Sequence, residues 1–282
     1  MTRHEFSRLT AMFFAASIPL CTAVAAEPLR FAPLPMESPE TVASQWKPAL
    51  DHLSRAIGQE VRFEYSDSYA EIIEKLRSGR LDLAYLGPLP YVALKEKFAA
   101  AEPVVRFNEA NGKDSYTCAL VALEERRLAP ARMRGLKVAL TQPLSTCGYL
   151  STDGLLHQGG GDLEHHRYRY LDKHDAVALA VARGEFDLGG LKTAIGRKYA
   201  HLGLAILAET APLPGFALIA HGERLGAARI EAIRQAFLRA EPAQRAGWGE
   251  NIRHGAVPAA DSDYAAVREL RRRTDIPQQG NF

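Results

Sequence analysis

Cysteine is scarce in this sequence, and so are long apolar runs and charge of one sign. Three cysteines occur in 282 residues, which excludes a small scaffold built on disulfides. Lysine and arginine number 35 against 33 aspartate and glutamate, a net charge of +2. Because no lysine- or arginine-rich run accompanies this balance, nucleic acid is not an expected partner. The sequence also lacks internal repeats, low-complexity tracts and a G-x-S-x-G nucleophile elbow.

What is present is enough apolar material for a folded core. Hydrophobic residues make up 47% of the chain, which excludes wholesale disorder. At roughly 100–200 residues per domain, the length allows one large domain or two modest ones.

The longest apolar stretch lies at the start of the chain. It follows Arg3 and Arg8, runs from Leu9 to Leu20, and is followed by the small residues of 23–26. This order is typical of a secretory signal peptide, and the stretch is shorter than the ~20 residues that span a membrane. We therefore predict a signal peptide over residues 1–26, cleaved near Ala26, and an exported soluble protein. An uncleaved anchor and a lipoprotein processed at Cys21 are the less favoured alternatives.

After residue 26, short β-rich runs alternate with amphipathic helical stretches. Apolar residues three or four apart predict a helix over 46–57, with Pro48 near its start. The other expected helices are 69–76, 89–98, 176–182 and 230–238, and the expected strands are 29–34, 61–65, 81–86, 116–123, 136–140, 168–171, 186–188, 204–207 and 216–220. This alternation predicts an α/β fold with parallel sheets and crossover helices. Two such series predict two lobes around a cleft, formed by residues 27–125 with 214–282 and by residues 126–213.

The segment Ser145-Thr146-Cys147-Gly148 carries the clearest chemical signal. A predicted strand ends at Leu140, and hydroxyl residues stand where the next helix begins. The first amides of a helix have no partner within the helix, and the helix dipole adds partial positive charge there. The segment therefore predicts a pocket for an anion that needs no lysine. The alternative is an ordinary helix cap, for which serine and threonine are the usual residues.

Two further helix starts could contribute. Tyr69 follows a predicted strand and could donate its hydroxyl, although a packing role is the alternative. Gly87 permits close backbone approach at the end of a strand, and Tyr91 lies on the first turn of the next helix. An ordinary tight turn between strand and helix is the alternative there.

Five segments, in their order and spacing, resemble the phosphate/phosphite/phosphonate-binding proteins of ABC importers. They are Tyr69–Ile73, Leu81–Tyr91, Tyr116–Val121, Ser145–Gly148 and His174–Val181, and the likeness spans about residues 29–240. The resemblance implies the fold of a type II periplasmic binding protein, whose two α/β lobes close on a small oxyanion by hinge motion. It implies a monomer that works in the periplasm without a cofactor and delivers its ligand to an ABC permease.

The resemblance also implies which residues hold the ligand. The first lobe would contribute Tyr69, the turn from Gly87 to Tyr91, and the strand of Tyr116 and Cys118. The second lobe would hold the oxyanion with Ser145, Thr146, Cys147 and Gly148. His174-Asp175 matches a position where phosphonate binders often have His-Glu. The shorter Asp175 departs from that pattern and puts aminoalkyl-phosphonate specificity in doubt.

The two cysteines after residue 26 depart from the family pattern. Cys147 replaces the second serine of a Ser-Thr-Ser-Gly loop, and Cys118 stands where the strand commonly has serine. Both would face the ligand, one in each lobe. They could fill space, form a disulfide in an oxidising compartment, or bind a soft oxyanion such as arsenite through thiols. The last hypothesis resembles the arsenite-sensing proteins of the same superfamily, which report to a histidine kinase.

Three functions therefore stay open. The first is capture of a small phosphonate-, phosphite- or phosphate-like oxyanion for an ABC importer. The second is a periplasmic metalloid sensor that uses Cys118 and Cys147 and signals to a sensor kinase. The third, of another class and disfavoured, is a hydrolase with Cys147 or Ser145 as nucleophile and His174 as base. Lys192, Arg197 and Lys198 could supply charge to the cleft, but surface solvation is the favoured interpretation.

Overall fold

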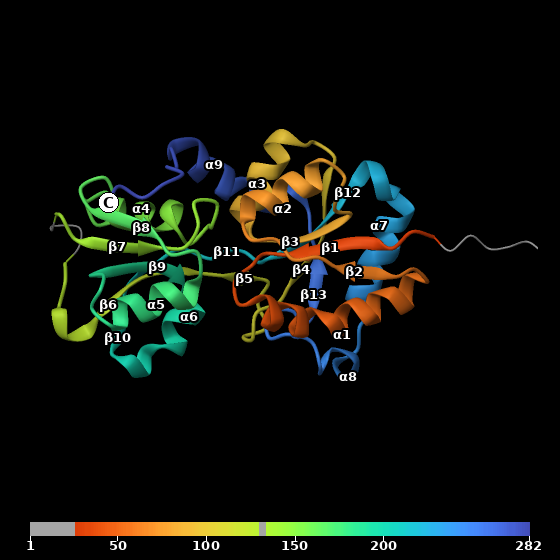
Figure 1. Cartoon of the computed structure of the whole chain (residues 1–282), viewed down its shortest axis with the longest axis horizontal. Helices are drawn as coiled ribbons and strands as arrows, with labels where there is room; N and C mark the ends of the chain where they lie inside the picture. Colours follow the sequence, from red (N-terminus) through yellow and green to blue (C-terminus); the bar gives the residue numbers. More distant parts are fainter. Residues whose placement is uncertain (1–25, 130–133) are drawn as a thin grey trace, which may run out of the picture.

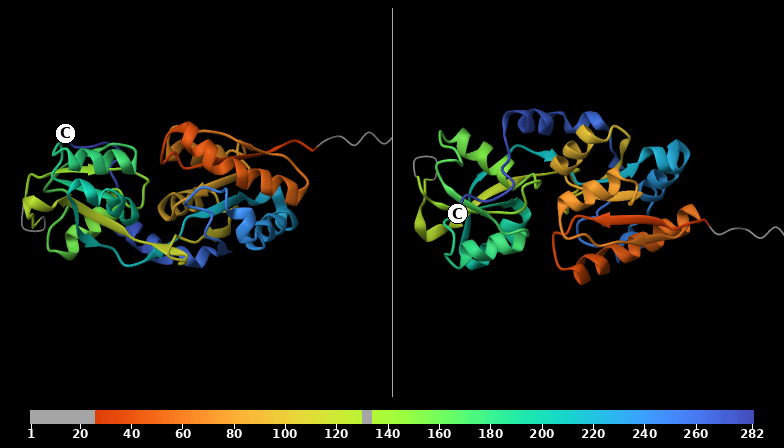
Figure 2. Two further views of the ribbon diagram at one scale, coloured as in Figure 1. Left: turned by 90° about the horizontal axis from the view of Figure 1, so that it is seen from below. Right: turned by 45° about the horizontal axis from the view of Figure 1, so that its top comes forward.

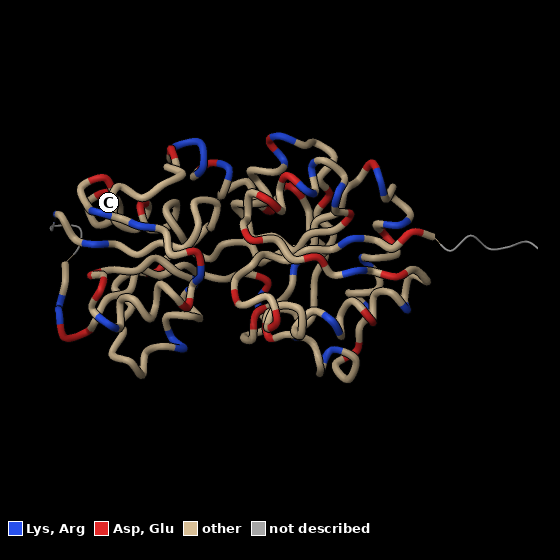
Figure 3. The backbone as a smooth tube through the Cα atoms, in the orientation of Figure 1, with Lys and Arg blue, Asp and Glu red and all other residues tan. Residues whose placement is uncertain are grey.

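The chain forms two α/β lobes side by side, joined by a narrow waist (Figure 1). This computed structural model describes residues 26–129 and 134–282, so the predicted signal peptide, apart from Ala26, lies outside it. Lysine and arginine are interspersed with aspartate and glutamate over both lobes (Figure 3). Within the described ranges, no helix is both long and apolar enough to cross a membrane.

The first lobe is built on a six-stranded sheet. Its order is β13 (Ala256–Pro258), β4 (Ala101–Phe107), β12 (Ala217–His221), β3 (Leu83–Leu86), β1 (Leu29–Pro33) and β2 (Val61–Phe63). β1 runs parallel to β2 and β3, whereas β12 is antiparallel to β3 and β4. The prediction of parallel sheets is therefore only partly right. β4 leads out toward the waist and β12 returns from it, so these two neighbours run in opposite directions.

Six helices accompany this sheet. They are α1 (Pro39–Ile57), α2 (Tyr69–Arg77), α3 (Pro88–Lys97), α7 (Gly222–Leu238), α8 (Pro242–Arg245) and α9 (Ala265–Arg273), with a short 3-10 turn, η4 (Asp261–Tyr264), before α9. α1 begins seven residues earlier than predicted because Ser38 accepts a hydrogen bond from the Thr41 amide and Pro39 fits the first turn. Pro48 consequently lies inside the helix rather than near its start. The Trp46 ring packs on Phe31 and Tyr85 at the centre of this lobe.

The second lobe is built on a five-stranded sheet. Its order is β10 (Leu204–Glu209), β6 (Cys118–Leu123), β9 (Leu188–Lys192), β7 (Lys137–Leu140) and β8 (Arg167–Tyr170). The helices are α4 (Tyr149–Gln158), α5 (His174–Ala182) and α6 (Thr193–Lys198), with 3-10 turns η1 (Glu124–Arg126) and η3 (Ala200–Leu202). β7 is parallel to β8 and β9, and β6 is antiparallel to β9 and β10.

The predicted strand 116–123 is two strands. β5 (Ser115–Tyr116) ends before Thr117 and pairs at the waist with β11 (Leu213–Pro214), while β6 joins the sheet of the second lobe. Residues 118–125, which the sequence division assigned to the first lobe, therefore lie in the second. The break occurs because β5 and β11 form the crossing between the lobes (Figure 1).

The end of the sequence makes a third crossing. α9 packs on the first lobe through its buried Val267, and the residues after it return to the second lobe (Figure 2). The Asn281 amide donates to the Tyr168 carbonyl at 3.0 Å, and the Tyr168 amide donates to the Asn281 side chain at 2.7 Å. Residues 276–282, placed in the first lobe by the sequence, thus cover β8, the edge strand of the second.

We expect removal of residues 277–282 to expose that edge. Loss of the Asn281 hydrogen bonds, and of the bond from the Tyr170 hydroxyl to the Pro277 carbonyl, should lower the free energy of unfolding by about 1–2 kcal/mol. An open strand edge also favours association between chains. Thermal unfolding with light scattering measures both effects. An unchanged midpoint and a monodisperse truncated protein would show that the segment is not part of the fold.

Candidate functional site

The loop between β7 and α4, residues 141–148, lies at the junction of the two lobes. Ser145, Thr146 and Cys147 are each less than 5% exposed. The Ser145 amide donates to the Gln142 carbonyl at 2.9 Å, and the Gly148 amide donates to the Ser145 carbonyl at 3.0 Å. Gly148 precedes α4 without a side-chain cap. No partner is found for the Thr146 and Cys147 amides in residues 26–129 and 134–282.

This loop contacts the N-termini of two helices of the first lobe. The Leu89 amide, in the first turn of α3, donates to the Thr146 hydroxyl at 3.0 Å. The Tyr69 amide, at the start of α2, donates to the Gln142 side-chain oxygen at 3.0 Å. The helix starts α2, α3 and α4 therefore converge on one loop, which concentrates positive partial charge there. The sequence predicted an anion pocket at this loop between the lobes, but here the loop is buried, because residues of the first lobe pack against it.

Two tyrosine hydroxyls reach the same loop. The Tyr69 hydroxyl and the Ser145 side chain are hydrogen-bonded to each other. The Tyr116 hydroxyl lies beside Thr146 and has no partner of good geometry among the described residues. Burial raises the pKa of both tyrosines far above the ordinary value. Both therefore keep their protons and can act as hydrogen-bond donors.

The cysteines form a disulfide. Cys118 on β6 is bonded to Cys147 in the loop, with their Cα atoms 5.0 Å apart. Both belong to the second lobe, so the prediction of one cysteine per lobe is wrong, because β6 joins the second sheet. A disulfide leaves no thiol to bind arsenite, and the structure does not support the metalloid hypothesis. The disulfide also argues against the two cysteines as mere space-filling residues and against Cys147 as a nucleophile.

A cavity lies between the lobes, and none of its lining residues belongs to the 141–148 loop. His174 and Asp175, at the start of α5, form one wall, and Tyr85 and Phe216 form the aromatic wall from the first lobe. Glu37 lies at the same cavity, whose empty space is about 460 Å³ when the open solvent at its mouth is included. The Phe216 ring stacks on Tyr85 at 5.4 Å between centroids.

Lys192 lies in the cleft, so the surface position that the sequence analysis favoured for it is wrong and the alternative, charge supplied to the cleft, fits. It lines this cavity at 8% exposure rather than the surface. Its ammonium lies 2.8 Å from the Glu109 carboxylate and 5.4 Å from the ring centroids of Tyr116 and Phe216. One signal for it was available: Lys192 ends a strand, and ligands of α/β sheets bind at the carboxyl ends of strands.

The other predicted residues are more dispersed. Gly87 precedes α3, and a Cβ there would lie 3.1 Å from the Phe216 ring, so a larger residue would push into the aromatic wall. Tyr91 points away from the loop, because its hydroxyl donates to Asp261 at 2.5 Å and its ring packs on Tyr264. Lys198 lies 3.8 Å from Asp175, and Arg197 pairs with Glu209 on the exposed side.

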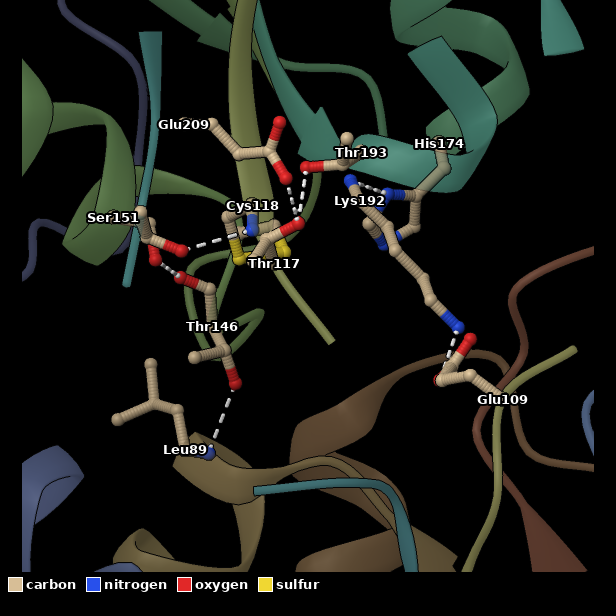
Figure 4. Close-up of a disulfide and its surroundings, with 12 residues drawn as sticks. Leu89, Glu109, Thr117, Cys118, Thr146, Ser151, His174, Lys192, Thr193 and Glu209 are labelled. Atoms are coloured by element: carbon tan, nitrogen blue, oxygen red, sulfur yellow. Dashed lines mark hydrogen bonds and ion pairs between the residues drawn. A yellow bond between two sulfur atoms is a disulfide. The ribbon is translucent and has the colours of Figure 1, made fainter. Parts of the chain in front are cut away.

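His174 is a neutral residue of the cavity wall. Its Nδ1 accepts a hydrogen bond from the Lys192 amide at 3.1 Å, which places the proton on Nε2. Burial, together with the charge of Lys192, lowers the pKa of His174 to about 3. Its Nδ1 thus accepts from the backbone, and Cys147 is in the disulfide, so His174 and Cys147 are not paired as base and nucleophile (Figure 4).

The lowered pKa of His174 predicts that the folded protein loses stability in acid. Between the ordinary pKa of 6.5 and the folded value of about 3, the unfolded chain binds a proton that the folded chain does not. Stability is therefore retained above pH 6.5 and falls as the pH drops, by about 2 kcal/mol between pH 7 and pH 5. Urea unfolding at these two pH values measures the loss.

The variant His174→Asn serves as its comparison. Its side-chain oxygen can still accept the Lys192 amide, but it cannot be protonated in this range. The variant should lose about 2 kcal/mol less than the wild type over the same interval. Equal losses in the two proteins would mean that His174 does not titrate as its burial requires.

Two α/β lobes, a paired-strand waist and polar groups converging between the lobes define a periplasmic binding protein of type II. The family model for the periplasmic substrate-binding protein of phosphonate ABC transporters matches residues 31–264. The chain belongs to that family.

Individual relatives agree with this assignment. A phosphate-import protein, PhnD, from Mycolicibacterium smegmatis is 25% identical over 86% of this chain and 85% of its own length. The phosphonates-binding periplasmic protein of Escherichia coli is 24% identical over 57% of this chain and 49% of its own length.

Solved structures share the fold. PhnD1 from Prochlorococcus marinus, in complex with methylphosphonate, superposes with a TM-score of 0.76 at 17% identity, over 87% of this chain and 97% of that one. A binding protein of a phosphonate transporter from Pseudomonas aeruginosa also gives 0.76, at 21% identity, over 87% and 86% of the two chains. The predicted fold class is confirmed.

Proposed function

We propose that this protein captures a small phosphonate-class oxyanion between its lobes and delivers it to an ABC permease. The observation that carries the proposal is the convergence of three helix N-termini on the 141–148 loop. Helix N-termini bind anions through their free amides and their dipoles. The membership of the chain in a family of ABC substrate-binding proteins supports the permease as partner.

The chemistry of the loop suits an oxyanion held by neutral donors. Tyr69, Tyr116, Ser145 and Thr146 offer hydroxyl groups, and the amides of 146 and 147 point from the same turn. Fixed dipoles of this kind replace the water shell of an anion without a full counter-charge. The ammonium of Lys192 is already paired with Glu109, so it is not the main counter-ion. The substituent on phosphorus would occupy the neighbouring cavity of Tyr85, Phe216 and His174.

Closure would order the donors around the ligand. The Leu89–Thr146 and Tyr69–Gln142 contacts join the lobes through the same polar groups that an oxyanion would use. A ligand of this size would exchange these contacts for its own oxygens, with the lobes turning about β5 and β11. Such hinge closure is the usual motion of periplasmic binding proteins.

The remaining parts of the proposal concern place and partners. The family is periplasmic, and we expect the leader to be removed near Ala26, leaving a monomer that binds its ligand without chemical turnover. A sensor role with a histidine kinase shares this pocket but needs another partner. Permease genes beside this one would favour import, whereas a kinase gene would favour sensing.

Isothermal titration calorimetry tests the ligand class. The oxidised protein is titrated with methylphosphonate, phosphite, phosphate and arsenite at one salt concentration. We expect binding of at least one of the phosphorus oxyanions and none of arsenite. Absence of heat with all three phosphorus ligands would overturn the proposal. Tight arsenite binding by the reduced protein, titrated in parallel, would restore the metalloid hypothesis.

A further inference from the structure

The Cys118–Cys147 disulfide lies near Thr146 and Lys192, two of the side chains that reach from the second lobe to the first (Figure 4). Thr146 directly precedes Cys147, and its hydroxyl accepts the Leu89 amide. Lys192 on β9 pairs in register with Cys118 on β6, and its ammonium contacts Glu109. These two cross-lobe contacts therefore originate beside opposite ends of one covalent bridge, whereas a third, from the Tyr69 amide to Gln142, lies further along the loop.

The hydrogen bonds of the loop within its own lobe are local. Ser145 and Gly148 donate to carbonyls of the same turn, and the Ser151 hydroxyl donates to the Thr146 carbonyl at 2.6 Å. These bonds shape the loop and join it to α4. Lys192, in contrast, is held by the strand pairing of β9 and by the hydrogen bond from its amide to His174. The covalent link between the loop and the ladder is the disulfide.

We propose that this disulfide is a positioning element for closure, which fixes Thr146 and Lys192 relative to each other so that both meet the first lobe together. Without the bridge, the loop moves independently of β6 and β9, and the two contacts no longer form as a unit. Closed molecules then become a smaller fraction of the population. The consequence for ligand affinity rests on the proposed function, whereas the consequence for lobe closure does not.

Because the disulfide is buried, its reduction depends on motion of the lobes. Cys118 is fully buried and Cys147 is 3% exposed, so a reductant reaches the sulfurs only when the surrounding structure opens. With dithiothreitol the step is balanced: its two thiols give two electrons and two protons to the bridge and become a cyclic disulfide, and Cys118 and Cys147 become thiols. A molecule that favours the closed state should slow this reaction, because it lowers the population of open molecules in which the reductant can reach the sulfurs.

The first experiment uses no ligand. Small-angle X-ray scattering compares the oxidised protein, the dithiothreitol-reduced protein and the double variant Cys118→Ala/Cys147→Ala, all well below their unfolding temperatures. We expect a larger radius of gyration in the reduced protein and in the variant. Equal radii in all three would overturn the proposal, whatever the protein binds.

A matched control separates positioning from general loss of stability. Phe186→Leu trims a buried ring of the same lobe that packs on Phe282, away from the cleft. This variant should unfold at a lower temperature with an unchanged radius of gyration. An equally expanded Phe186→Leu protein would show that destabilising the second lobe alone opens the molecule, which would also overturn the proposal.

The second experiment uses methylphosphonate as the probe. If the competent arrangement falls to about one tenth of the population, the apparent Kd of the double variant rises about tenfold. Methylphosphonate should also slow reduction of the wild-type bridge, measured by alkylation of the released thiols. A wild type that does not bind the probe would count against the proposed function alone. Larger radii of gyration with an unchanged Kd would show that the bridge affects closure only in the ligand-free protein. That result would overturn its expected effect on ligand affinity.

Discussion

Replacing Thr146 with valine should weaken methylphosphonate binding by about 5- to 150-fold, the equivalent of 1–3 kcal/mol for a hydrogen bond to a charged group. The substitution keeps the shape of the side chain and removes the hydroxyl. It also leaves the Leu89 amide of α3 facing a methyl group instead of an acceptor. Both the lobe contact and the expected oxyanion donor are lost at once. Calorimetry of the two proteins against methylphosphonate measures the difference.

The matched control is Thr152→Val. Thr152 is 1% exposed, its hydroxyl has no partner among the described residues, and it faces Gly190 within the second lobe. The same chemical change there should leave the Kd within about twofold, since no hydrogen bond is removed. If Thr146→Val binds as tightly as the control, the Thr146 hydroxyl does not hold the ligand.

Substituting Gly190 by alanine should destabilise the protein by about 3 kcal/mol, at the upper end of the range for overpacking a core. A Cβ at this position of β9 would lie 1.9 Å from the Thr152 hydroxyl oxygen and 3.1 Å from the Cys147 carbonyl oxygen. α4 and the end of the 141–148 loop would have to shift to admit it. Urea unfolding should therefore show a lower free energy of unfolding, and binding should weaken as well.

The double variant Gly190→Ala/Thr152→Ala tests the cause. Removal of the Thr152 hydroxyl takes away the nearest clash, so the second substitution should recover much of the loss. Neighbouring residues in direct contact commonly show such coupling in a double-mutant cycle. Additive losses in the cycle would mean that strain elsewhere in β9, and not the contact with α4, makes glycine necessary.

The parts of the site that sequence could predict are local in the chain. Thr146 and Gly148 stand at the end of a strand and the start of a helix, and that short pattern alone indicates exposed amides. Tyr69 is similar, because it begins α2 a few residues after the end of a strand. The alternation of strands and helices likewise predicted two α/β lobes, since each unit spans only a few tens of residues.

The rest depends on contacts between distant segments. Lys192 is held in the cleft by Glu109, which lies 83 residues away in the chain. Tyr91 is drawn out of the site by Asp261, 170 residues distant. The strands β12 and β6 are antiparallel to their neighbours because of where the chain re-enters each sheet. The spacing of apolar residues within a strand does not reveal this direction. The position of Cys118 was missed because the strand breaks at Thr117, one residue before it.

The return of residues 276–282 to the second lobe affects how that lobe could be produced as a separate fragment. A fragment spanning only 117–212 would lack residues 276–282, although these bond to β8 in the intact protein. A synthetic peptide with the sequence of 274–282 should therefore bind that fragment and raise its melting temperature. Joining the same nine residues to either end of the fragment through a flexible linker offers a design for a self-contained half-molecule.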